Sequence, residues 1–429
     1  MKIPKTSICL NNNDFITNHK SDKIPYIGAR ALFDPNFIPP HFIERKKKSE
    51  FLRGVILDAI EDEYSININL YGLEGIGKNL LVNNFLQNLS VEQLRSSIKG
   101  KSNQKNQKIY ILRVDLSEKE PEQIFFAILS QLSSIIKLQL NFNELLKTTP
   151  IKLWNSLKLI IDRLDYPIIL FLQKSENLSA FYLTKLYNYA KKSRKLQIIT
   201  TINTGMQHYS FKQYGGMDHR IQMGIYDIKE LQKITADRSV MAFEKTLESE
   251  SINLIIDYVS EYDIMVPGAC VNLMKELYPI VRQDGNLTPK MLRNTTQYYF
   301  DSYNLDAITF ADFVTSSSIE DRLFLEYIVD FFRNNKHFYI PFGEIKQAYN
   351  MTCEELGYEI SDQEFFSSLR KITQAQVICP SKINQKAESR RTNGIYCVPH
   401  FLTLPVYEVN ELINISFGME DNTLESFEN

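Results

Sequence analysis

A short glycine-rich segment with one lysine is the part of this sequence best suited to chemistry. Residues 71–80 read YGLEGIGKNL, and Gly72, Gly77 and Lys78 fit the pattern G-x-x-x-x-G-K-[ST]. In that pattern the backbone N–H groups surround phosphates, the lysine contacts them, and the final hydroxyl binds Mg²⁺. Asn79 stands at the final position, so an amide replaces the hydroxyl. The segment predicts a phosphate-binding loop that lacks one of its usual metal ligands.

The segments on either side of the loop are those that a phosphate-binding loop needs. Residues 66–71 are β-prone and run directly into the glycines, and apolar residues recur at helical spacing over residues 79–89. A loop between a strand and a helix start directs backbone N–H groups at an anion. The sequence therefore predicts that the whole loop binds nucleotide: Gly72, Leu73, Glu74, Gly75, Ile76, Gly77, Lys78 and Asn79.

The composition is that of a globular protein with several domains. The 429 residues are 44% hydrophobic and 23% charged, which is ordinary, and this length suggests about three domains. No long apolar stretch predicts a membrane span, and the N-terminus lacks the apolar core of a signal peptide, so we expect a cytoplasmic protein without a membrane partner. The five cysteines are dispersed without a C-x-x-C pair, so no metal site is predicted.

The order of β-prone and helical segments predicts an α/β fold. Further β-prone runs at 109–114, 168–172, 197–202 and 221–225 alternate with helical patterns at 122–140, 153–164 and 180–192. Such alternation indicates a parallel sheet covered by helices. Successive helices follow between 229 and 300, and a third unit begins after a polar stretch. We expect an N-terminal arm at 1–30, a P-loop α/β domain at 31–226, helices at 227–303, a linker at 304–318, a third unit at 319–415 and a tail at 416–429.

The third unit reads as three helices followed by a basic hairpin. Helical patterns cover 319–332, 342–356 and 361–373, with Ser361 or Asp362 placed to cap the third. Two β-prone runs follow, at 375–379 and 394–398, and the loop between them is basic. This order is typical of a winged helix, whose third helix enters the major groove of DNA. A winged helix that contacts only protein is the alternative. Because the formal net charge is −2, binding to nucleic acid would depend on local basic clusters.

Several segments, in the right order, resemble a known family. They are ALFDPNFIPPHFIER at 31–45, the loop itself, LTKLYNYAKKSRKLQIITTINTG at 183–205, IYDIKELQKITADRSVMAF at 225–243, and IKQAYNMTCEELGYEISDQEFFSSLRKITQAQVI at 345–378. These segments resemble archaeal replication initiators related to the eukaryotic origin recognition complex and cell division control proteins. The resemblance implies an AAA+ P-loop parallel sheet with an α-helical lid and a C-terminal winged-helix domain.

The resemblance also implies positions for catalytic residues, and this chain departs from them. Asn203 occupies the position of the first sensor and joins the predicted nucleotide-binding residues. Gln173 and Lys174 stand where the family has a metal-binding Asp and a catalytic Glu, and Gly268 stands where a second sensor has Arg. Hard cations select charged oxygen ligands, and a lysine is protonated at neutral pH. We therefore expect no catalytic residues and no hydrolysis. ATP or ADP can still bind, whereas nothing at these positions favours Mg²⁺.

For DNA, the resemblance implies contacts from the third helix of the winged helix and from its wing. The candidate residues are Gln363, Ser367, Ser368 and Lys371 on the helix, and Lys382, Lys386, Arg390 and Arg391 in the wing. The resulting prediction is an intracellular, chromosome-associated protein of the origin-recognition type that binds double-stranded DNA with a degenerate nucleotide site. Other initiators or helicase-loading proteins are the protein partners it implies. Two alternatives are a non-catalytic protein-interaction subunit and an active ATPase with relocated acids, such as Glu176.

Overall fold

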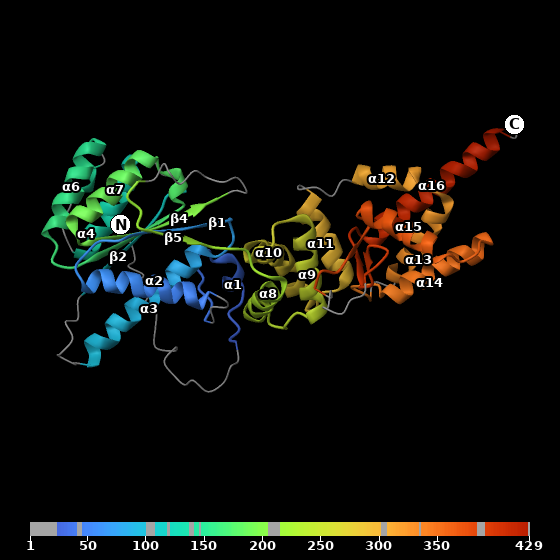
Figure 1. The fold of residues 1–429 in the computed structure, drawn as a ribbon, viewed down its shortest axis with the longest axis horizontal. Helices are drawn as coiled ribbons and strands as arrows, with labels where there is room; N and C mark the ends of the chain where they lie inside the picture. The colour runs from blue at the N-terminus through green and yellow to red at the C-terminus, as the bar shows by residue number, and fades with distance from the viewer. Residues whose placement is uncertain are drawn as a thin grey trace, which may run out of the picture.

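Three parts of the chain lie in a row along the long axis of the molecule (Figure 1). The structure is a computed structural model that describes residues 24–40, 45–99, 108–117, 121–136, 141–145, 147–204, 215–301, 307–333, 336–383 and 391–427. The first part, up to residue 226, is called the base. The second, formed by helices α8–α11, is called the lid, and the third, from residue 307 onward, is the C-terminal unit.

The base contains a five-stranded parallel sheet in the order β2-β3-β4-β1-β5. The strands are β1 (Asn67–Gly72), β2 (Tyr110–Asp115), β3 (Ile168–Gln173), β4 (Leu196–Asn203) and β5 (His219–Gln222). The first four lie within one residue of their predicted ends, whereas β5 begins two residues before the predicted 221–225. Strand β3 is buried along almost its whole length, as a strand covered on both faces should be.

Helices cover both faces of this sheet. The described helices of the base are α1 (Arg30–Phe33), which packs against the lid, and α2 (Lys46–Glu61), α3 (Lys78–Lys99), α4 (Pro121–Ile136), α5 (Phe142–Leu145), α6 (Pro150–Arg163) and α7 (Ala180–Ser193), with a 3₁₀ turn at Ser175–Asn177. Apolar side chains of α2 and α3 pack with one face of the sheet, and those of α4, α6 and α7 pack with the other. The alternation predicted from the sequence therefore gives the layered α/β architecture.

The lid consists of four successive helices, α8 (Ile228–Ala242), α9 (Ser249–Tyr262), α10 (Pro267–Asp284) and α11 (Pro289–Asp301). Helix α8 begins with a capping box, in which Asp227 accepts from the Glu230 N–H at 2.7 Å and Glu230 accepts from the Asp227 N–H at 2.9 Å. Helix α10 begins at a proline and ends at Gly285, which has a φ of 76°. These local signals fix where the lid helices start and stop.

The C-terminal unit packs five helices with two small antiparallel sheets. The elements are α12 (Ala307–Ser316), α13 (Ile319–Arg333), α14 (Phe342–Leu356), α15 (Asp362–Gln374), β6 (Ile378–Pro380), β7 (Arg391–Thr392), β8 (Ile395–Tyr396), β9 (His400–Leu402) and α16 (Val406–Phe427). Ser361 caps α15 by accepting from the Glu364 N–H. Asn393 and Gly394 connect β7 to β8 with φ angles of 48° and 86°, which is the geometry of a tight hairpin turn.

Three of the expected boundaries differ from the structure. The stretch 304–318, expected as a linker, contains α12, whose Phe310 and Val314 are buried in the core of the C-terminal unit. Their spacing is that of a helical apolar stripe, which a count of polar residues obscures. Helix α16 continues through the expected start of the tail, and Ser416 is buried. In the expected arm, the Ile27 and Gly28 N–H groups donate to the Met241 carbonyl, while residues 1–23 lie outside the described residues.

A buried carboxylate joins the lid to the C-terminal unit. Asp257 of α9 is 1% exposed and accepts from Tyr339 Oη at 2.9 Å, Ser381 Oγ at 2.6 Å, and the backbone N–H groups of Lys382 at 2.8 Å and Ile383 at 3.4 Å. Burial raises the pKa of Asp257, and these four donors oppose that shift. Beside it, Tyr258 Oη donates to the Leu402 carbonyl at 2.8 Å. The two parts are therefore connected by satisfied buried polar groups.

Candidate nucleotide and DNA sites

The glycine-rich loop between β1 and α3 is shaped by glycines that other residues could not replace. Gly72, Gly75 and Gly77 have φ angles of 153°, 72° and 92°, which side chains rarely allow. A Cβ on Gly72 would lie 2.6 Å from the Met223 carbonyl oxygen. The loop thus exposes backbone at the N-terminus of α3, where a helix favours an anion.

Lys78 is held inside this loop. Its side chain is 6% exposed, and Nζ donates to the Gly72 carbonyl at 2.8 Å and to the Leu73 carbonyl at 2.6 Å. Burial lowers the pKa of Lys78 to about 8, and the charges of Glu176 and Glu74 oppose the shift. An ammonium group has three N–H donors, so two loop carbonyls leave one for a ligand.

The amide at position 79 is part of a side-chain network. Asn79 Oδ1 accepts from Thr201 Oγ1 at 2.8 Å, and Asn79 Nδ2 donates to Gln173 Oε1 at 3.4 Å. The same threonine oxygen accepts from the Lys174 N–H at 3.3 Å. The structure therefore brings together three of the positions at which the sequence departs from the family pattern, and two amides face each other there.

Glu176 is the acidic residue closest in sequence to this network. It lies in the turn Ser175–Asn177, immediately after β3, and its Oε2 atom is buried without a hydrogen-bond partner in the part of the chain that the structure describes. Its charge also acts on Lys78. Glu176 is thus close enough to the phosphate-binding loop for its charge to act on Lys78.

A cavity of about 320 Å³ lies where the loop meets the lid. Apolar residues of the segment 31–39 and of α8 contribute to its wall, including Leu32, Phe37, Ile234 and Met241. Of the predicted nucleotide-binding residues, the cavity is lined by Glu74, Gly75, Gly77, Lys78, Asn79 and Asn203, together with Lys174 and Gly268. Gly72, Leu73 and Ile76 do not line it, and Ile76 is 0% exposed. A wall that is mostly apolar, with polar groups gathered at the phosphate-binding loop, suits a ligand with phosphates and a flat apolar group.

The lid touches the loop through two glycines. The Gly268 N–H donates to the Gly75 carbonyl at 3.1 Å, and a Cβ on Gly268 would lie 2.6 Å from Gly75 Cα. A side chain at this position, including the arginine of the family pattern, would force the lid away from the loop. The glycine at position 268 is therefore required by the observed contact between lid and base.

Sequence reasoning missed a lysine on the same face of α10. Gly268, Val271, Asn272 and Lys275 all line the cavity, at helical positions i, i+3, i+4 and i+7. Lys275 Nζ donates to Asn272 Oδ1 at 3.1 Å. The helical spacing from Gly268 was the signal that could have identified Lys275 as a cation facing the ligand space.

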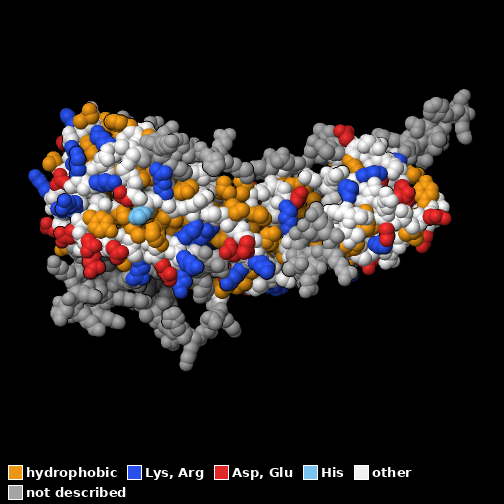
Figure 2. All heavy atoms as spheres, in the orientation of Figure 1, with side chains coloured by type: hydrophobic (Ala, Val, Ile, Leu, Met, Phe, Trp, Pro, Cys, Tyr) orange, Lys and Arg blue, Asp and Glu red, His pale blue; other side chains and the backbone are white. Residues whose placement is uncertain are grey.

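The predicted DNA-contact residues of α15 fall into two groups. Gln363 and Ser367 are exposed, as expected. Ser368 is 4% exposed, because one residue after the exposed Ser367 the helix faces the core. A contact between Ser368 and DNA stays a prediction, and its burial does not support it. Figure 2 shows Lys and Arg side chains mixed with Asp and Glu over the visible face, with no single large basic surface.

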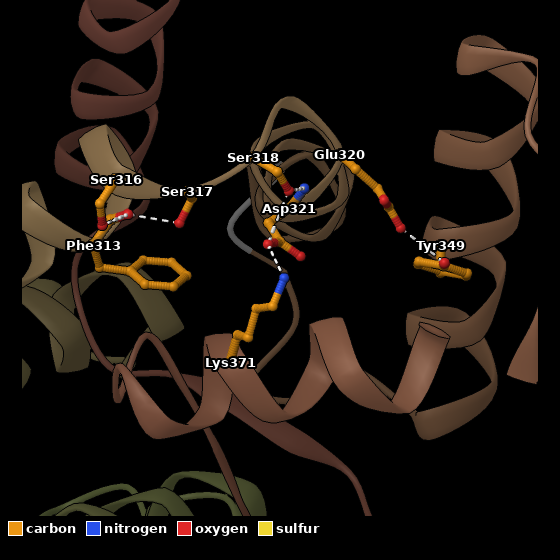
Figure 3. Close-up of polar contacts among 8 residues, drawn as sticks. All are labelled: Phe313, Ser316, Ser317, Ser318, Glu320, Asp321, Tyr349 and Lys371. Atoms are coloured by element: carbon orange, nitrogen blue, oxygen red, sulfur yellow. Dashed lines mark hydrogen bonds and ion pairs between the residues drawn. The ribbon is translucent and has the colours of Figure 1, made fainter. Parts of the chain in front are cut away.

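Lys371 is held by a buried acid instead of pointing freely into solvent. Figure 3 shows it reaching from α15 to Asp321 at the start of α13, where Nζ lies 2.6 Å from Asp321 Oδ2. Asp321 is 2% exposed and also accepts from Ser318 Oγ at 3.0 Å. Lys371 therefore balances a buried charge, while its own side chain remains 52% exposed. Its contact with DNA stays a prediction.

Arg370 is the DNA-facing candidate that sequence reasoning missed. It is exposed and lies seven residues after Gln363 and three after Ser367, on the same helical face. Its Nη2 donates to the Asn393 carbonyl at 2.5 Å, which attaches the helix to the β7–β8 turn. The i, i+4, i+7 spacing was the available signal.

The predicted wing residues are only partly described. Lys382 follows the end of β6 at Pro380, at the start of the predicted basic loop. Its Nζ donates to the Ser260 carbonyl at 2.7 Å and lies 3.1 Å from Glu261 Oε2, so this lysine contacts the lid. Its contact with DNA stays a prediction. Lys386 and Arg390 lie outside the described residues, and for Arg391 the structure gives only the backbone at the start of β7.

Comparisons with known proteins bear on the fold. No protein-family model and no curated protein matches the sequence. Among solved structures, the chain is similar to Cdc6p from Pyrobaculum aerophilum, with a TM-score of 0.69 and 14% identity over 92% of this chain and 100% of that one. It is also similar to the Aeropyrum pernix ORC1 protein in complex with DNA, with a TM-score of 0.52 and 15% identity over 90% and 96%.

Within the described residues, no helix is long and apolar enough to cross a membrane. The order of the sheet, the loop after β1 and the helical lid agree with the overall similarity to these two proteins. The chain therefore has the α/β AAA+ fold of the Cdc6 and origin recognition complex type.

Proposed function

We propose that this protein is an initiator-like DNA-binding protein that binds a nucleotide and does not hydrolyse it. The observation that carries the proposal is that one chain of this fold contains both a phosphate-binding loop that keeps its glycines and Lys78, and an exposed helix face attached to a β-hairpin. The protein would act inside the cell on chromosomal DNA. Other initiators or helicase-loading proteins are the protein partners that fit this function.

Nucleotide binding is supported by groups that need no metal. The strained glycines keep the backbone accessible, and Lys78 supplies a charge at the base of the loop. Hydrogen bonds to charged groups contribute about 1.5–3 kcal/mol each, so Gly75, Gly77 and Lys78 could hold phosphates of ATP or ADP. Lys275 and Lys174 line the same cavity and add positive charge.

Loss of hydrolysis is supported by the Asn79–Gln173 pair. Mg²⁺ prefers charged oxygen ligands in octahedral geometry, and the residues at the two expected ligand positions are neutral amides hydrogen-bonded to each other. These residues do not fit Mg²⁺. Phosphoryl transfer depends on a metal and on a positioned base, and Lys174 cannot replace a carboxylate base.

DNA binding is supported by the C-terminal unit, which we interpret as a winged helix. Helices α13, α14 and α15 and the hairpin β7–β8 occur in the order of that motif. Arg370 takes the place of Lys371 on the exposed helix face, and Lys386, Arg390 and Arg391 remain as wing candidates. Four phosphate contacts predict a slope of log K against log salt of about −3.6.

The nucleotide proposal is tested by calorimetric titration of ATP and ADP with and without Mg²⁺. We expect equal affinity in both conditions and no turnover. The Lys78→Ala change removes a charged contact and should weaken binding about 10–150-fold, whereas Lys185→Ala, outside the cavity, should not. Turnover that Lys78→Ala and Glu176→Gln both abolish would overturn the proposal in favour of an active ATPase with a relocated acid.

The DNA proposal is tested by fluorescence anisotropy of labelled duplexes over a range of salt concentrations. Arg370→Ala should weaken all duplexes about equally and reduce the salt slope by about 0.9. Lys233→Ala, an exposed lysine of the lid, is the matched control. No binding at about 50 mM salt would refute DNA binding and leave a protein-interaction subunit as the function.

A further inference from the structure

A second, smaller cavity lies between the lid and the C-terminal unit, away from the phosphate-binding loop. Its volume is about 210 Å³, and its wall includes Lys290 and Arg293 of α11, Arg333 of α13, and Val406, Tyr407 and Asn410 at the start of α16. The described residues that line it include three basic side chains and no acidic one. The cavity is below the range of about 300–1,000 Å³ that is usual for larger ligands, so a single small anionic group fits its size.

Arg293 is a buried cation with unused hydrogen-bond donors. It is 0% exposed, and its Nη2 donates to the His337 carbonyl at 2.6 Å. Its Nε and Nη1 atoms are buried without a hydrogen-bond partner, and the guanidinium lies 4.7 Å from the centre of the Phe332 ring. Burial lowers the pKa of Arg293, yet a guanidinium stays charged at neutral pH.

A buried guanidinium without a negatively charged partner lowers the stability of the folded protein. Among the residues that the structure describes, none offers Arg293 a carboxylate within ion-pair distance. Asp330 and Glu408, which neighbour the cavity-lining residues Arg333 and Tyr407, are already engaged. Asp330 pairs with Arg333 at 3.0 Å, and Glu408 accepts from Tyr407 Oη at 2.9 Å and from Gln297. The unused N–H donors of Arg293 are therefore available to bind an anion that is not part of the described chain.

The start of α16 adds to the same preference. This helix has 22 residues, and its first N–H groups lack partners within the helix. Val406 and Tyr407, which line the cavity, belong to that first turn. A helix start carries partial positive charge and favours anions. Lys290 is exposed at the rim, and Arg333 Nη2 donates to Asn410 Oδ1 at 2.8 Å across the cavity wall.

We propose that this cavity is a second anion site, which binds one phosphate group independently of the phosphate-binding loop. Phosphate matches the planar donor groups of arginine and the N–H groups of a helix start. Free phosphate and a backbone phosphate of nucleic acid share this chemistry. A bound phosphate neutralises Arg293 and connects the lid to the C-terminal unit through α11, α13 and α16.

The test is thermal unfolding in sodium phosphate and in sodium chloride of matched ionic strength. Four proteins are compared, namely wild type, Lys290→Gln with Arg333→Gln, Lys78→Ala, and Lys336→Gln as an exposed control outside the cavity. Phosphate stabilises proteins in general through exclusion from the surface, so the quantity of interest is the increment in Tm relative to the double variant. Binding to the native state adds stability that grows with phosphate concentration.

We expect phosphate to raise Tm more in wild type, in Lys78→Ala and in Lys336→Gln than in the double variant. The Lys78→Ala protein excludes the phosphate-binding loop as the source of the effect. In a parallel arm, the affinity of duplex DNA is measured for wild type and the double variant. A lower affinity and a salt slope smaller by up to about 0.9, as expected for one phosphate, identify a backbone phosphate as the ligand, whereas an effect on Tm alone identifies free phosphate.

The proposal is overturned if phosphate raises Tm equally in wild type and the double variant and DNA affinity is also unchanged between them. It is likewise overturned if the increment disappears in Lys78→Ala and persists in the double variant, because the phosphate-binding loop would then be the site. Neither result depends on whether the nucleotide site hydrolyses ATP.

Discussion

The lid contacts the base in one way and the C-terminal unit in another. Toward the base, α10 approaches the phosphate-binding loop through Gly268 and Gly75, beside a cavity of about 320 Å³. Toward the C-terminal unit, Asp257 is 1% exposed and collects four hydrogen bonds, while Tyr258 and Phe401 pack edge to face with ring centres 5.2 Å apart. The first junction contains space for a ligand the size of a nucleotide. The second is held by buried polar and aromatic contacts, and its cavity beside Arg293 has space for a single small group.

This difference indicates which parts of the molecule respond to nucleotide. A ligand in the cavity of about 320 Å³ would contact both the phosphate-binding loop and α10. Its binding free energy would therefore depend on the position of the lid relative to the base. The junction between lid and C-terminal unit has no such freedom, because moving it breaks buried hydrogen bonds. We therefore expect the lid and the C-terminal unit to move as one body when a nucleotide binds, which would couple the proposed nucleotide site to α15, the helix proposed to contact DNA.

The largest effect is expected at the junction between lid and C-terminal unit. The Asp257→Ala change leaves Tyr339, Ser381 and two backbone N–H groups buried without an acceptor, and should lower the free energy of unfolding by about 3–5 kcal/mol. Chemical denaturation followed by tryptophan and tyrosine fluorescence measures this loss, and limited proteolysis should then cut between lid and C-terminal unit. Asp284→Ala, an exposed acid of the same lid, is the control. Equal stability of the two variants would mean that the junction is not held by Asp257.

A smaller effect is expected at the junction between base and lid. The Gly268→Ala change places a Cβ 2.6 Å from Gly75 Cα, so the lid must move away from the loop. Overpacking of this kind costs about 1–3 kcal/mol. Because the contact forms one wall of the cavity, we expect the affinity for ADP to fall roughly 5–150-fold in calorimetric titration. Gly54→Ala in α2 is the matched control, since nothing lies within 4 Å of its added Cβ. Unchanged affinity in Gly268→Ala would show that lid position and nucleotide binding are independent.

The same contrast explains how much of the molecule could be predicted from the sequence. The phosphate-binding loop is built from backbone and strained glycines, and its position between β1 and α3 follows from local pattern alone. The first four strands were found for the same reason, because buried parallel strands are continuous apolar runs. The six loop and sensor residues that line the cavity needed no knowledge of tertiary contacts.

The DNA-facing side chains could not be predicted with the same accuracy, because their roles depend on distant partners. Lys371 looked free until the structure placed it beside Asp321, fifty residues earlier in the chain. Lys382 looked like part of the wing, yet its partners Ser260 and Glu261 belong to the lid. Neither the sequence near a lysine nor the helical pattern around it specifies a carboxylate from another element. Helical spacing alone does indicate two other basic residues, because Arg370 lies three residues after the exposed Ser367 and Lys275 lies seven residues after Gly268.

The smallest expected effect is the change of the affinity for ADP with pH, which tests the junction between base and lid directly. Burial lowers the pKa of Lys78 to about 8 in the free protein, and an adjacent phosphate favours the protonated lysine. Above pH 8, Lys78 therefore takes up a proton when the nucleotide binds. The affinity has its full value below that pH and decreases as the pH rises. The expected fall in affinity for ADP is about 25-fold between pH 7.5 and 9.5. Calorimetry in two buffers with different ionisation enthalpies measures the proton uptake, which Lys78→Ala should abolish. If affinity stays constant up to pH 9.5, Lys78 does not contact the phosphates, and the cavity at the base–lid junction has another kind of ligand.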